Sequence, residues 1–217
     1  MRTCRSFRDF FARDRGDVPI DDAPEHLISP CDGWLTCCTI ESDSGIDIKG
    51  VRYRMRDLID DPPLAQRFEG GVCLVLRLSP SDCHHYCFID DAYLWQNHYL
   101  PCGLLNAQAS GHAPYPAAVL HRRCWCLMAT RSFGPVIQAE IGAVAVGSIV
   151  NRIKSGRVCR GEEKGHFELA GSTVALLFEP GRIRLLPDIH RALENGIEVK
   201  VQKGMWIGNR EPPSTQP

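Results

Sequence analysis

The chain has 217 residues, a mass of 24.2 kDa, 25 Lys and Arg residues, 26 Asp and Glu residues, and a formal net charge of −1. Hydrophobic residues make up 44% and charged residues 24%, which is ordinary globular usage and excludes a disordered, collagen-like or coiled-coil chain. The balanced charge supplies no overall basic field, so nucleic acid is not an expected partner. The length fits a single domain over residues 1–217.

The first predicted element is an amphipathic helix over residues 5–15. Phe7, Phe10 and Phe11 fall on one face of this helix. That face either packs on the domain, which is the interpretation we favour, or docks on an anionic membrane surface.

The rest of the chain is predicted to be mostly strand. Strands are expected at residues 34–40, 72–78, 92–99, 104–109, 124–130, 136–149, 173–178, 182–186 and 197–201. Short helical turns are expected within residues 51–66 and 190–194, and a frayed tail after Gly208. Short strands, with 19 Gly and 15 Pro residues available for turns, predict a mainly β, barrel- or sandwich-like single domain with a few short helices.

The 11 cysteines do not have the spacing of a zinc site. Cys37 and Cys38 are adjacent, Cys124 and Cys126 are two apart, and no pair has the C-x-x-C spacing. No signal-peptide pattern is evident, and the longest apolar run, residues 141–150, is shorter than the roughly 20 residues of a spanning helix. We therefore expect a cytoplasmic protein with reduced structural thiols and no metal, with a thiol-rich metal-binding protein as the alternative.

The most informative stretch is GEEKGHFELAGST at residues 161–173, which ends in Gly-Ser-Thr directly before a buried strand. Taken alone, Ser172 is a turn residue entering that strand. Neither a Walker sequence nor a G-x-G-x-x-G loop is present, so no nucleotide cofactor is expected.

Six segments, in order, resemble those of the phosphatidylserine decarboxylase family of pyruvoyl-dependent, self-cleaving enzymes. They are FFAR with VPID (residues 10–13 and 18–21), SPCDG (29–33), IKG followed by Tyr53 (48–50), RLSPSDCH (77–84), FG with EIGA and VG (133–134, 140–143 and 146–147), and residues 161–173. The resemblance covers residues 7–208 and implies a carboxy-lyase that converts phosphatidylserine to phosphatidylethanolamine.

The resemblance also implies site residues. Ser172 attacks the carbonyl of Gly171, His84 takes the serine proton as base, and Asp32 holds the imidazole tautomer. Asp82 supports the site. Cleavage leaves a β chain of residues 1–171 and an α chain of residues 172–217 whose first residue becomes the pyruvoyl group.

The pyruvoyl carbonyl then acts as an electron sink through a Schiff base with the substrate amine, and His84 returns a proton to the product carbon. The implied partners are a phospholipid substrate and a second processed αβ unit in a homodimer. Peripheral contact with the inner face of the cell membrane is a further expectation.

Several positions depart from the family pattern. Cys83 replaces a tyrosine, Ala170 replaces a glycine, and His85 stands where the family commonly has arginine. Residues 104–107 and 121–124 also differ, so the substrate-binding residues stay unassigned. A pyruvoyl-dependent decarboxylase of a free amino acid and a non-catalytic β-barrel module are therefore the alternative functions.

Overall fold

The computed structural model describes residues 16, 18–41, 45–48, 51–100, 121–142, 149–168 and 172–212. Its strands are β1 (His26–Ile28), β2 (Gly33–Thr39), β3 (Ile46–Ile48), β4 (Val51–Tyr53), β5 (Val72–Leu78), β6 (His85–Cys87), β7 (Ala92–Leu100), β8 (Arg123–Thr130), β9 (Gly134–Ile141), β10 (Ile149–Asn151), β11 (Gly156–Val158), β12 (Glu163–Phe167), β13 (Ser172–Phe178), β14 (Ile183–Leu185), β15 (Val199–Val201) and β16 (Trp206–Arg210). Its helices are α2 (Met55–Ile59), α3 (Pro62–Arg67) and α4 (Pro187–Glu194). The prediction of a mainly β domain with a few short helices is confirmed.

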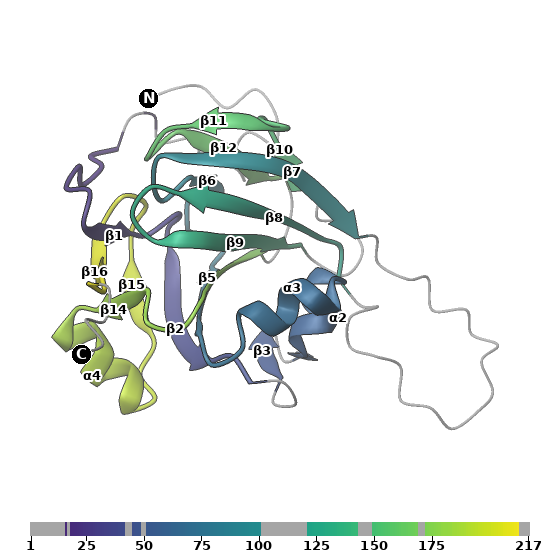
Figure 1. Cartoon of the computed structure of the whole chain (residues 1–217). Helices are drawn as coiled ribbons and strands as arrows, with labels where there is room; N and C mark the ends of the chain where they lie inside the picture. The colour runs from purple at the N-terminus through teal and green to yellow at the C-terminus, as the bar shows by residue number, and fades with distance from the viewer. Residues whose placement is uncertain are drawn as a thin grey trace.

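The largest sheet has eight strands in the order β11-β7-β8-β9-β13-β5-β2-β15 (Figure 1). In the described part of the chain this sheet ends at β11 and β15, so it is open and does not close into a barrel. Its centre is β13, which pairs antiparallel with both β5 and β9. Every residue of β13 is buried, because both faces of this central strand are covered.

The two faces of the large sheet carry separate cores. On one face, alternate residues such as Leu76 and Val174 pack with side chains of the small sheets β10-β12-β6 and β1-β16-β14. On the other face, the intervening residues such as Val75 and Ala175 pack with α2 and α3, which Figure 1 shows beside the sheet. The period of two along each strand produces this division.

Most predicted strands are present, with several corrections. The expected strand at residues 136–149 is two strands, β9 and β10, and residues 51–66 begin with β4 before α2 and α3. The tail beyond Gly208 was predicted to fray, but Asn209 of β16 pairs with both β1 and β14. Sequence patterns missed seven short strands: β1, β3, β4, β6, β11, β12 and β16. The predicted helix at residues 5–15 and strand at residues 104–109 lie outside the described residues.

Candidate active site

Three adjacent strands of the large sheet, β2, β5 and β13, bring the predicted catalytic segments together at one end of the strands. Arg77 of β5 pairs with Trp34 of β2 on one side and with Thr173 of β13 on the other. One step further along, Leu78 pairs with Ser172. The turn that holds Asp32 precedes β2, and the loop that leads to His84 follows β5, so both adjoin the start of β13.

His84 is buried and its backbone is anchored on both sides. Its carbonyl oxygen accepts a hydrogen bond from the Phe167 amide at 3.1 Å, which ties it to the end of β12. The preceding Cys83 amide donates to Oδ2 of Asp32 at 3.4 Å. Since β12 leads within a few residues to Ser172, these contacts hold the imidazole and the serine segment in the same region.

Asp32 connects three segments of the chain. Besides the contact with Cys83, its Oδ1 accepts a hydrogen bond from the Lys203 amide at 2.9 Å. The carboxylate is buried, and backbone N–H groups of this kind stabilise its negative charge. Asp32 therefore fixes the position of the loop that carries His84.

The protonation of His84 follows from its hydrogen bond. Its Nδ1 lies 3.0 Å from the backbone carbonyl oxygen of Asp82. A carbonyl oxygen only accepts, so Nδ1 carries the hydrogen and the neutral ring has its lone pair on Nε2. The orienting role predicted for the Asp32 side chain stays a prediction, and the Asp82 carbonyl is an additional group that holds Nδ1. An imidazole in this tautomer is suited to act as a base.

The Asp82 side chain closes the turn after β5. Its Oδ2 accepts from the Ser79 amide at 2.8 Å and from the Ser79 hydroxyl at 2.7 Å, and its Oδ1 lies 2.5 Å from the Lys200 ammonium. Burial raises the pKa of Asp82, but the hydrogen bonds from Lys200 and Ser79 outweigh burial, and the pKa lies below its ordinary value. The Ser79-x-x-Asp82 spacing could have revealed the turn, whereas no sequence signal pointed to Lys200, which is 118 residues away.

Ser172 is the first residue of β13 and is almost completely buried. Gly171, the other side of the predicted cleavage site, lies outside the described residues. The structure thus places Asp32, Asp82, His84 and Ser172 at one end of these strands, held by strand pairing and backbone hydrogen bonds.

A buried ion pair inside the first core links β9 to β12. Lys164 Nζ lies 2.8 and 2.9 Å from the two carboxylate oxygens of Glu140 and 3.0 Å from Oδ1 of Asn151. Both charged side chains are 0% exposed. Burial by itself lowers the pKa of Lys164, but its neighbours, Cys126 and Glu140, outweigh burial and raise it. Both residues lie in the segments that resemble the family, yet no local pattern predicted their contact.

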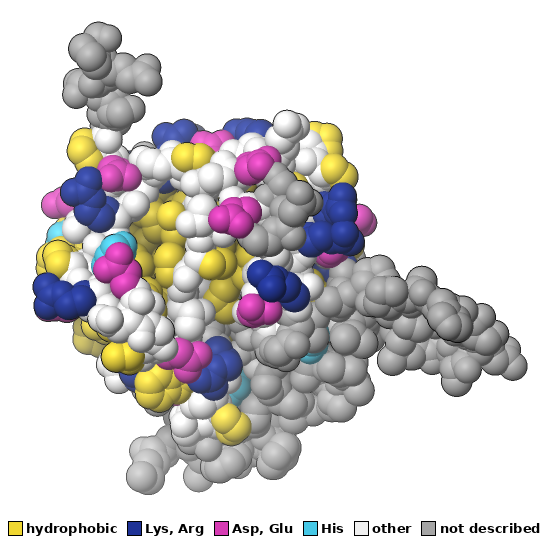
Figure 2. Space-filling view, turned by 90° about the horizontal axis from the view of Figure 1, so that it is seen from below, with side chains coloured by type: hydrophobic (Ala, Val, Ile, Leu, Met, Phe, Trp, Pro, Cys, Tyr) yellow, Lys and Arg dark blue, Asp and Glu magenta, His cyan; other side chains and the backbone are white. Residues whose placement is uncertain are grey.

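A cavity of about 760 Å³ lies next to the start of β13, against the second face of the sheet. Thr173, Arg77 and Arg52 are among its lining residues. Figure 2 shows one face of the protein, on which hydrophobic side chains fill a recessed centre and charged side chains lie around it.

His121 belongs to the segment 121–124, which departs from the family pattern. It is buried, and its Nδ1 contacts the Tyr53 hydroxyl at 2.5 Å.

The cysteines contribute to the cores. Cys124 and Cys126 are both buried in the first core, as their alternate spacing on a strand predicts. Burial raises the pKa of Cys126 to about 11, so the thiol is protonated at neutral pH. All nine cysteines of the described residues are free thiols.

Comparison with known proteins identifies the family. Residues 7–208 match the family model described as phosphatidylserine decarboxylase. The phosphatidylserine decarboxylase proenzyme of Clostridium perfringens (strain SM101 / Type A) is 36% identical over 217 residues, covering 94% of this chain and 71% of the relative. The proenzyme of Clostridium beijerinckii is 37% identical over 211 residues (95% and 71%), and that of Desulfitobacterium hafniense (strain Y51) is 35% identical over 222 residues (97% and 72%).

The chain belongs to the phosphatidylserine decarboxylase family, a family of pyruvoyl-dependent carboxy-lyases. Its reaction is the conversion of phosphatidylserine to phosphatidylethanolamine, as the sequence resemblance predicts. None of the helices in the described residues has the length and hydropathy to cross a bilayer.

Proposed function

We propose that this chain makes its own pyruvoyl group by cleavage between Gly171 and Ser172, giving a β chain of residues 1–171 and an α chain of residues 172–217. The observation that carries the proposal is the meeting of three segments at one end of these strands. Ser172 pairs with Leu78, and the loop that follows Leu78 carries His84. A break before Ser172 leaves the pairing of β13 with β5 and β9 intact, so the fold accommodates a new chain end there.

Self-cleavage needs a base for a hydroxyl that is otherwise a weak nucleophile. Nε2 of His84 accepts the proton of the Ser172 hydroxyl, and Oγ attacks the Gly171 carbonyl carbon, converting the peptide bond into an ester. Loss of the Ser172 α-proton then breaks the ester C–O bond, releasing the Gly171 carboxylate and leaving dehydroalanine. Water replaces the nitrogen of that residue, ammonia leaves, and residue 172 ends as a ketone.

In decarboxylation the bound pyruvoyl group supplies a carbonyl that withdraws the electrons left when carbon dioxide departs. His84 delivers a proton to the product carbon from Nε2, while the Asp82 carbonyl keeps Nδ1 protonated. Asp32 is a positioning residue, since its carboxylate holds the Cys83 and Lys203 amides on either side of the site.

Mass spectrometry of the denatured protein tests the cleavage. Wild-type protein is expected as two chains that break before Ser172, and the Ser172→Ala and His84→Ala variants as single chains of about 24 kDa. Asp32→Ala is expected to cleave at least about tenfold more slowly, because the loop is no longer fixed. Ser132→Ala is the matched control, because the Ser132 hydroxyl contacts Asp90 and neither residue belongs to the proposed site. This variant should cleave like wild type. An uncleaved wild type, or a cleaved Ser172→Ala variant, contradicts the proposal.

We further propose that the processed αβ units form a homodimer that binds peripherally to the inner face of the cell membrane, where the phospholipid substrate is located. Product analysis with phosphatidylserine vesicles and with free amino acids separates the lipid reaction from the soluble alternative. Flotation with anionic and neutral vesicles tests membrane binding, and absence of binding to both contradicts it. Sedimentation of the processed protein tests the dimer.

A further inference from the structure

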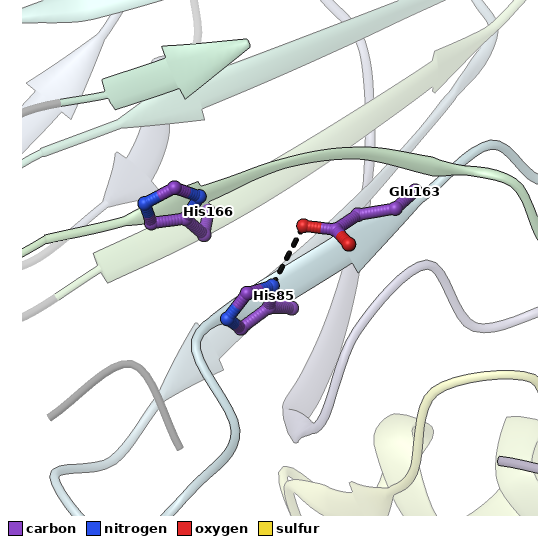
Figure 3. A group of neighbouring side chains, drawn as sticks. All are labelled: His85, Glu163 and His166. Carbon is purple, nitrogen blue, oxygen red and sulfur yellow. Dashed lines mark hydrogen bonds and ion pairs between the residues drawn. The ribbon is translucent and has the colours of Figure 1, made fainter. Parts of the chain in front are cut away.

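A second cluster of polar side chains lies on the β6–β12 ribbon, next to His84 in the chain but separate from the proposed catalytic residues. His85 of β6 and His166 of β12 are directly paired across the two strands. Glu163 starts β12, and a register shift between Glu163 and Gly165 inserts an extra residue. In a regular strand, residues 163 and 166 point to opposite faces; the bulge brings them to the same side. Figure 3 shows the three side chains together.

The spacing of the three side chains suits a metal ion. One ligand atom from each residue lies within 4.8 Å of the other two. His85 Nδ1 and Glu163 Oε1 are 2.7 Å apart, and the two imidazole rings are stacked with centroids 5.0 Å apart. Ligand atoms on a tetrahedral zinc ion lie roughly 3.3 Å apart, because the bonds are about 2.0–2.1 Å long. To reach this spacing the shortest separation, 2.7 Å, must lengthen, and separations of up to 4.8 Å must shorten.

One imidazole nitrogen in the cluster is buried and has no hydrogen-bond partner among the described residues. His166 Nδ1 is inaccessible to solvent and makes no hydrogen bond within the described residues. A neutral imidazole whose nitrogen makes no hydrogen bond can offer its lone pair to a metal ion.

The Glu163 carboxylate can take part without breaking the fold. Its described contacts, with His85 and with the Arg152 guanidinium at 3.0 Å, both use Oε1. Arg152 is 54% exposed, so its side chain can turn toward solvent when a cation replaces it. His85 is only 7% exposed and stays in place as the fixed ligand of the site.

We propose that His85, Glu163 and His166 form a binding site for a divalent transition metal of the zinc class, with water as the fourth ligand. Two imidazoles and one carboxylate favour such an ion over magnesium or calcium, which prefer all-oxygen ligands. His85 is the position at which the resemblance to the family leads us to expect arginine, so the cluster is not part of the expected family pattern. It fastens β6 to β12, the strand whose Phe167 amide holds the His84 carbonyl. The inference does not depend on the proposed cleavage mechanism.

Titration of the metal-free protein, as purified, with Zn²⁺ in a calorimeter and with Co²⁺ in a spectrophotometer tests the site. Wild type is expected to bind one equivalent of Zn²⁺ and to melt at a higher temperature when loaded. The Co²⁺ spectrum is expected to lack the thiolate charge-transfer band, which would mark binding by some of the 11 cysteines. Replacing a ligand, in His166→Ala or Glu163→Gln, should weaken binding at least about tenfold.

The matched control is His190→Ala, which removes a histidine whose Nδ1 lies 3.2 Å from Glu194 on the exposed surface of α4. This variant should bind Zn²⁺ like wild type. The His85→Arg variant restores the family residue and should lose binding while staying folded, as circular dichroism can verify. Absence of stoichiometric binding, a thiolate band, or unchanged affinity in His166→Ala overturns the proposal.

Discussion

The Lys164–Glu140 pair offers the sharpest test of what holds the first core together. Replacing Lys164 with Met keeps the length of the side chain but removes the ammonium, which makes three polar contacts of 2.8–3.0 Å. Because both charged groups are 0% exposed, the change leaves the Glu140 carboxylate without its cation inside the core. Breaking a buried pair in this way costs about 3–5 kcal/mol of unfolding free energy.

The unfolding free energy lost in Lys164→Met should depend on pH. Burial raises the pKa of Glu140, and in wild type the Lys164 charge opposes that rise. Without Lys164 the pKa rises further, so the folded variant holds a proton on Glu140 in mildly acidic solution. When folding raises the pKa of a carboxyl, its proton stabilises the folded protein at low pH, and the protein loses this stability as pH rises through the folded-state pKa. Lys164→Met should therefore lose more stability at pH 8 than at pH 5.

Urea unfolding, carried out in the Ser172→Ala background so that every protein is a single chain, measures these differences. The double variant Lys164→Met/Glu140→Met places two apolar side chains together and should lose less stability at pH 8 than Lys164→Met alone. The control Arg184→Ala removes an exposed partner of Glu211 and should cost less than about 1 kcal/mol. A loss below about 1 kcal/mol for Lys164→Met at both pH values, or additive effects in the double variant, would refute the reasoning.

Two further predictions concern titratable groups. The pKa of Asp82 is lowered on folding, so its contribution to the free energy of unfolding is present above the pKa of an unfolded carboxyl and is lost as pH falls below about 4. Asp82→Asn should lower the free energy of unfolding by about 1–2 kcal/mol at pH 7 and by little at pH 3. An equal loss at both pH values would contradict this. Cys37 and Cys159 are both exposed, but partial desolvation of the thiol, together with Cys38, raises the pKa of Cys37 to about 11, so iodoacetamide should label Cys159 of native protein well before Cys37. Peptide mapping follows the labelling, and equal rates would contradict the assigned environments.

The sequence by itself determined the central strands and the family, and it predicted which residues form the site. The run of residues 173–178 is apolar enough to be buried on both faces, and it forms most of β13 at the middle of the sheet. The family segments supplied Asp32, His84 and Ser172, because short motifs record which residue types the chemistry needs. Short strands such as β1, β3 and β6 escaped prediction, since a period of two cannot be recognised over three residues.

Only the tertiary structure decided which distant groups meet. Lys200 reaches Asp82, and Lys164 meets Glu140, because strand order and register bring together segments that no local pattern connects. The metal-binding cluster depends on a single extra residue in β12, which turns Glu163 toward the same side as His166. A bulge of this kind changes the direction of side chains without leaving a mark in the alternation of residue types, so its consequences appear only when the strands are paired.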